Sequence, residues 1–120
     1  MRLEAKKHLY DIEQAAELIA GFTAGKTLAD YEGDAMRRAA VERQFEIIGE
    51  ALAQLARLDE PLAARISEYR RIIAFRNILI HGYAEIDHRI VWDIVESKLP
   101  TLRREVAALL EEKEAWPETG

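Results

Sequence analysis

The sequence predicts an all-α fold, an up-and-down bundle of four long helices with short accessory helices. Apolar residues recur at spacings of three and four along most of the chain, whereas strand-like alternation and internal repeats are absent. The chain has 120 residues, which is the size of one ordinary domain. We therefore expect a single domain over residues 1–120, with a flexible tail from about residue 111.

Three stripes of apolar residues predict the long helices before and after the central segment that contains residues 76–83. The first helix covers residues 2 to about 20, the second follows Asp34 as its N-cap, and the last segment follows Asp87 as its N-cap. Pro100 interrupts the last stripe, so we expect a kink or a break there. The stripes consist of Leu9, Ile12, Ala16 and Ile19; of Val41, Phe45, Ile48, Leu52 and Leu55; and of Val91, Val95, Leu99, Leu102, Val106 and Leu109. Between the second and third stripes, Asp59 and Pro61 predict the start of a short helix over residues 61–69.

The amino-acid composition excludes several classes of function. The net charge of −5 argues against broad, sequence-independent binding to a nucleic-acid backbone, but it leaves a local basic cleft open. Cysteine is absent, which excludes disulfides and thiolate metal sites and fits a cytoplasmic protein. No apolar run is long enough to cross a membrane. We expect no cofactor, no metal site and no membrane partner.

Residues 76–83 read RNILIHGY and place polar side chains within an apolar run. Apolar residues around most of the circumference predict a largely buried helix, in which polar groups need partners or a function. Asn77 and His81 share one face, whereas Arg76 and His81 are about 140° apart. Gly82 suits the helix C-cap, so His81 lies in the last turn. On spacing alone, a structural ion pair of Arg76 and a capping histidine fit as well as a catalytic site.

RNILIHGY resembles the Arg-x4-His-x-Tyr signature of HepT-like proteins in the HEPN superfamily. Residues 39–52 resemble the family's second long helix and residues 86–102 the segment after the signature, so the resemblance runs from about residue 9 to about residue 110. It implies a HEPN-like homodimer, formed through the signature helices, that cuts RNA without a required metal. Glu50 matches positions near the family's shared cleft and is a weak site candidate. The family often has a tryptophan before the signature, where this chain has Tyr69.

The motif offers the groups that RNA cleavage needs. His81 can act as a general acid or base near neutral pH. The guanidinium of Arg76 suits phosphate oxygens, and Asn77 can orient His81 or donate to the phosphate. One histidine cannot easily be both acid and base in one step, whereas a dimer supplies two. We therefore predict an endoribonuclease with Arg76 and His81 as catalytic residues.

The resemblance also implies a partner. HepT-like toxins of type VII-like HEPN/MNT systems are usually paired with MntA, a minimal nucleotidyltransferase antitoxin. In the family, MntA transfers AMP to the signature tyrosine, here Tyr83, and the added charge and bulk would block an RNA cleft. RNA is the expected substrate, and DNA is not expected.

Two alternatives to a toxin ribonuclease stay open. One is a non-catalytic module that binds a nucleotidyltransferase and is modified at Tyr83 without cutting RNA. The other is a plain helical dimer in which Arg76 is structural. The acidic net charge favours these two, and the intact motif favours the ribonuclease.

Overall fold

The computed structural model describes residues 1–82 and 86–112. Within them the chain is helical apart from turns and contains no strand, so the predicted all-α class is confirmed. Tyr83 and the part of the predicted tail from residue 113 onward lie outside the described residues. The helices are α1 (Leu3–Thr23), α2 (Leu28–Glu32), α3 (Ala35–Leu58), α4 (Glu60–Ala63), α5 (Tyr69–His81), α6 (His88–Ser97) and α7 (Leu99–Glu111).

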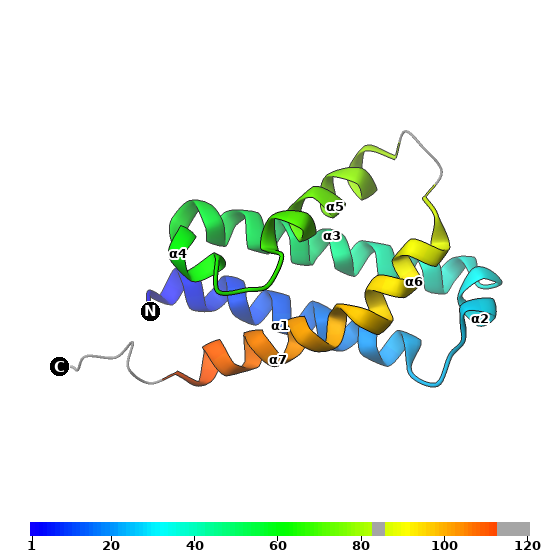
Figure 1. Cartoon of the computed structure of the whole chain (residues 1–120), viewed down its shortest axis with the longest axis horizontal. Coiled ribbons are helices and arrows are strands. Elements are labelled where there is room, and N and C mark those ends of the chain that lie inside the picture. Colours follow the sequence, from blue (N-terminus) through cyan, green and yellow to red (C-terminus); the bar gives the residue numbers. More distant parts are fainter. Residues whose placement is uncertain (83–85, 113–120) are drawn as a thin grey trace.

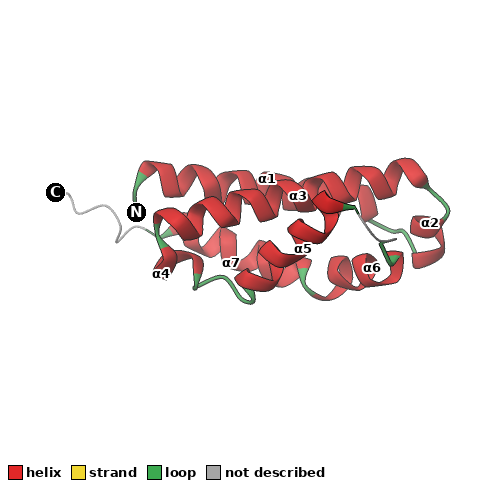
Figure 2. Ribbon diagram, turned by 90° about the horizontal axis from the view of Figure 1, so that it is seen from above, coloured by secondary structure: helices red, strands yellow, loops and turns green. Residues whose placement is uncertain are grey.

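Helices α1, α3 and α7 run lengthwise through the bundle (Figure 1). Helix α1 packs along α3 on one side and α7 on the other, and α5 packs along α3 (Figure 1). Figure 2 shows α1 and α3 side by side over the length of the molecule, with the short α2 at one end and α4 towards the other. Helix α6 runs back towards α7 and contacts it and α2.

The apolar stripes read from the sequence form the core. Every residue of the three stripes is buried, from Leu9 on α1 to Leu109 on α7. The last stripe runs across two helices, because the chain breaks at Lys98 and Pro100 lies in the first turn of α7. The predicted break is therefore confirmed, and it starts two residues before the proline.

Aspartate side chains begin three helices as predicted. The carboxylate of Asp34 accepts a hydrogen bond from Arg37 N at 3.0 Å, that of Asp59 from Leu62 N at 3.2 Å, and that of Asp87 from Arg89 N at 2.9 Å. Each bond satisfies a backbone donor that the first turn leaves unpaired.

The predicted extent of the short helix over residues 61–69 is wrong. Helix α4 ends at Ala63, and the chain turns before α5 begins at Tyr69. Glu68 adopts the left-handed conformation with φ 57° directly before α5, so one continuous helix cannot pass through it. The first helix also runs further than predicted, to Thr23.

Helix α5 is less buried than its apolar sequence predicts. Within α5, all of which is described, only Leu79 is buried, while Ile78 is 61% exposed and Ile80 is 49% exposed. The prediction of a largely buried helix is therefore wrong for the single chain. The reason is that α5 packs along α3 and leaves its opposite face open.

Candidate active site

A close contact between α3 and α5 positions the motif. Gly49 on α3 lies directly against Arg76 on α5, and a Cβ added to Gly49 would lie only 2.2 Å from the Cβ of Arg76. No side chain fits at position 49 without moving one of the helices. The glycine therefore lets α5 approach α3 closely at the start of the motif.

Arg76 is held against α3 by charge as well as by packing. Its Nη2 lies 3.4 Å from Glu50 Oε1, and its side chain is 18% exposed. Glu50 also accepts a hydrogen bond from Gln54 Nε2 at 2.8 Å. This hydrogen bond lowers the pKa of Glu50 below its usual value, and the charge of Arg76 acts in the same direction. The carboxylate therefore stays ionised beside the guanidinium.

The guanidinium of Arg76 keeps one unsatisfied donor. Its Nε is buried and has no hydrogen-bond partner among residues 1–82 and 86–112. A buried donor of this kind costs free energy unless a ligand or water satisfies it. Arg76 is therefore anchored by Glu50 while its Nε stays unsatisfied within the described residues.

His81 lies at the opposite side of α5 from this anchor. It is the last residue of the helix and is exposed, and Asn77, one turn earlier, is exposed on the same face. Gly82 ends the helix in the left-handed conformation with φ 59°, and its N–H donates to Ile78 O at 3.2 Å. The predicted C-cap is confirmed.

The structure thus brings some of the predicted site residues together and separates others. Arg76 meets Glu50, and Asn77 shares a face with His81, but Arg76 and His81 leave α5 in different directions. Tyr83 lies outside the described residues. Within the part of the chain that is described, no three His, Cys, Asp or Glu side chains gather where they could hold a metal ion.

Sequence reasoning missed the role of Gly49. A glycine inside a strongly helical pattern is a signal of close packing, because it otherwise destabilises the helix. Glu50 was predicted as a site candidate near the family's shared cleft, and it pairs with Arg76.

Comparison with known proteins identifies the family. The family model described as "Ribonuclease HepT-like" matches residues 12–109. The chain belongs to the HepT-like ribonuclease family. The predicted fold and the predicted enzyme class, a ribonuclease, agree with this membership, and the recognition made from the motif is confirmed.

Relatives of this family cover most of the chain. "Probable ribonuclease HepT" of Thermococcus cleftensis is 35% identical over 103 residues, which is 86% of this chain and 93% of that protein. "Putative RNase MJ1380" of Methanocaldococcus jannaschii is 33% identical over 103 residues, 86% of this chain and 94% of that protein.

One relative is longer than this chain. "Gamma-glutamylcyclotransferase and putative RNase MJ0434" of the same archaeon is 32% identical over 116 residues. The match covers 93% of this chain but only 50% of that protein. No solved structure matches the chain significantly. None of the helices in residues 1–82 and 86–112 is long and apolar enough to cross a membrane.

Proposed function

We propose that this chain is the ribonuclease toxin of a HEPN/MNT toxin–antitoxin pair and that it cuts RNA at a site shared by two chains. The observation that carries the proposal is the arrangement of α5. His81 and Asn77 are exposed on one face, and the exposed Ile78 lies beside them, while Arg76 is anchored against α3. A second chain placed on this open apolar face would add a second set of the same groups.

Two histidines at one site supply both proton transfers. His81 of one chain takes the proton of the RNA 2′-hydroxyl, and the 2′-oxygen attacks the adjacent phosphorus. His81 of the partner subunit gives a proton to the 5′-oxygen as the P–O5′ bond breaks. The products are a 2′,3′-cyclic phosphate and a 5′-hydroxyl, and no metal takes part.

Arg76 stabilises the phosphorane in this scheme. The negative charge that develops on the phosphorane oxygens is matched by a guanidinium, which presents several N–H groups in one plane. Its ion pair with Glu50 limits the rotamers that the side chain can adopt, so less conformational entropy is lost when phosphate binds. Glu50 is therefore proposed as a positioning residue.

Expression in cells tests the proposal. We expect the wild type to arrest growth and degrade RNA, while His81→Ala does neither and keeps the same helical content by circular dichroism. His81 is exposed at a helix end, so its loss should leave the fold intact. If both proteins are folded and harmless, the proposed activity is wrong.

Control of the toxin is assigned to a nucleotidyltransferase that transfers AMP from ATP to Tyr83. The proposal predicts that a partner of the MntA type, incubated with ATP, adds AMP to the wild type and abolishes its RNA cleavage. Tyr83→Phe should stay unmodified and keep cutting RNA in the presence of that partner. Mass spectrometry of both proteins measures the modification, and modification of Tyr83→Phe would contradict the assignment.

The contacts of Arg76 favour a second candidate, a structural helical dimer that does not cut RNA. In that case Arg76→Ala lowers the free energy of unfolding, whereas Arg76→Lys, which keeps the charge near Glu50, has close to the wild-type value. Neither the wild type nor the variants cut RNA. If Arg76 binds the phosphorane, Arg76→Lys is folded but loses most of the cleavage rate, because an ammonium lacks the planar fork. Unfolding and cleavage measured on both variants separate the two candidates.

A further inference from the structure

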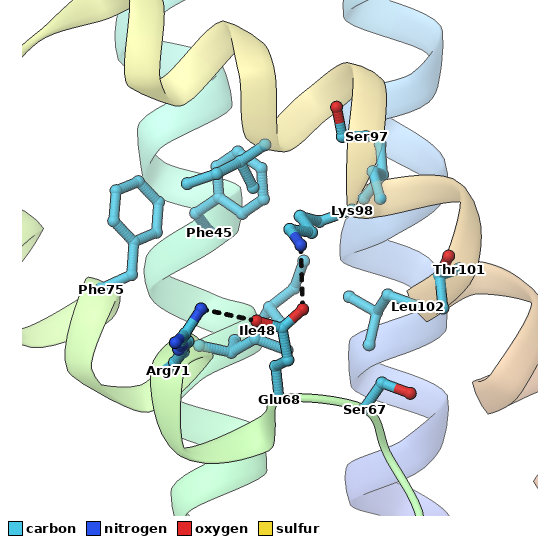
Figure 3. A pocket seen from close by; sticks show the side chains of 13 residues that line it. Phe45, Ile48, Ser67, Glu68, Arg71, Phe75, Ser97, Lys98, Thr101 and Leu102 are labelled. Carbon is cyan, nitrogen blue, oxygen red and sulfur yellow. Dashed lines mark hydrogen bonds and ion pairs between the residues drawn. The ribbon is translucent and has the colours of Figure 1, made fainter.

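A cavity separates the start of α5 from the junction of α6 and α7. Its volume is about 460 Å³, within the range of about 300–1,000 Å³ typical of ligand sites. Figure 3 shows the side chains that line it. Apolar side chains form most of its wall, including Phe45 on α3 and Phe75 on α5. The centroids of these two rings are 5.5 Å apart, and their planes are inclined by 76°. Two aromatic rings therefore line this cavity.

Two cations stand at the edge of this cavity and share one carboxylate. Lys98 Nζ donates to Glu68 at 2.9 Å, and Arg71 Nη1 donates to the other oxygen of Glu68 at 3.0 Å (Figure 3). All three side chains are more than one third exposed, and ion pairs so exposed contribute little to stability. An anionic ligand can therefore displace Glu68 from both cations at low cost.

The lining suits a nucleotide better than an apolar partner segment. Aliphatic side chains of a partner protein would form no ion pair with the two cations at the edge of the cavity. An unstacked base can stack on Phe75, while its phosphate meets Arg71 and Lys98. Single-stranded RNA is usually recognised through such unstacked bases.

The cavity is also correctly placed for a substrate that reaches His81. Phe75 directly precedes Arg76 on α5, and Arg71 lies ten residues, or about 15 Å along the helix axis, before His81. The exposed Ala74 lies on the helix surface between them. A single strand of a few nucleotides spans this distance.

We infer that this cavity is a subsite for one unstacked base of the RNA substrate, a few nucleotides from the bond that is cut. The inference rests on the proposed function and adds a site that would determine the sequence preference of cleavage. Arg71 and Lys98 bind the phosphate next to the bound base. Glu68 then acts as a competitor of that phosphate in the free protein.

Binding of a short fluorescent single-stranded RNA, measured by anisotropy on a His81→Ala background, tests the subsite. Phe75→Leu should weaken binding about 5- to 150-fold, the range for losing one base–aromatic stack. Phe22→Leu, at a half-buried position of α1 that does not line the cavity, is the matched control and should leave binding unchanged. Glu68→Gln should tighten binding more than Glu17→Gln, which makes the same charge change on an exposed position of α1.

An abasic scan of the RNA makes the test independent of folding defects. Removing the base at one position should weaken binding to the parent protein, and Phe75→Leu should show no further loss with that RNA. If the two losses add, or if Phe75→Leu and Phe22→Leu bind alike while the wild type cuts RNA, the subsite is wrong and the proposed function stands. If the wild type neither binds nor cuts RNA, both are wrong.

Discussion

Tyr31 carries the largest side chain among the fully buried residues, and its hydroxyl has no hydrogen-bond partner within residues 1–82 and 86–112. Its ring packs against Trp92 at 5.4 Å and His88 at 6.3 Å between ring centroids. Burial raises the pKa of Tyr31 above its usual value, and the nearby charge of Glu42 acts in the same direction. The neutral hydroxyl is therefore strongly favoured in the folded state.

Tyr31→Phe tests this position. At pH 7 we expect a change within about 1 kcal/mol, because the lost hydroxyl makes no hydrogen bond. The pKa of Tyr31 is higher in the folded state than in the unfolded state, where it is about 10. The stabilisation linked to this difference is complete below about pH 10, and wild-type stability falls as the pH rises above that value.

Urea unfolding at pH 7 and near pH 11 measures this effect. Tyr31→Phe should lose less stability than the wild type between the two pH values, whereas Tyr10→Phe, at an exposed position of α1, should follow the wild type. Equal losses in the wild type and Tyr31→Phe would contradict the account.

At the residue scale, the sequence predicts hydrogen bonds between residues close together in the chain. It does not predict which residues of two different helices contact each other. The caps Asp34, Asp59 and Asp87 were predicted because each bonds to a backbone N–H only two or three residues away. The contact of Gly49 with Arg76 joins α3 and α5, and no short-range spacing reveals which residues of two helices meet.

At the scale of elements, the approach of α5 to α3 depends on Gly49. Gly49→Ala should destabilise the protein by about 1–3 kcal/mol, because the new Cβ would overlap the side chain of Arg76. It should also lower RNA cleavage, since the displaced helix carries the motif. Heat or urea unfolding and a cleavage assay measure both effects.

Gly21→Ala is the matched control for this change. Gly21 lies inside α1, and a Cβ there would meet nothing within 4 Å. Alanine is the better helix former, so Gly21→Ala should be neutral or stabilise by up to about 1 kcal/mol. Equal effects of the two substitutions would show that the α3–α5 contact is not tight.

Helices with a one-sided apolar stripe were easier to predict than α5. The apolar stripes of α1, α3 and α7 each lie on one face of the helix, and that face packs into the core. The spacing of the apolar residues was therefore enough to predict which residues are buried. Helix α5 is apolar on most sides, and this pattern does not distinguish burial within one chain from burial against another. Its exposed Ile78 is therefore the reason for the dimer proposal.

At the scale of the whole molecule, the proposed dimer through α5 is testable. Ile78 is 61% exposed in the single chain, so Ile78→Glu should keep the fold. It should dissociate the dimer and reduce cleavage at least about 100-fold, because removing one acid–base group typically costs that much. Light scattering gives the mass, and a cleavage assay gives the rate.

Met36→Glu is the control for the dimer test. Met36 is 86% exposed at the start of α3, so a charge there should change neither the mass nor the rate. A monomeric wild type that cuts RNA at full rate would contradict the shared site, although it would leave the ribonuclease assignment in place.

The most direct test of the central claim is cleavage of RNA by the purified protein in excess EDTA. We predict that the wild type cuts and leaves 2′,3′-cyclic phosphate ends, and that folded His81→Ala, which lacks both the acid and the base of the shared site, is slower by at least about 10,000-fold. Cleavage that is lost in EDTA, or that His81→Ala retains in full, would contradict a metal-independent ribonuclease built on this histidine.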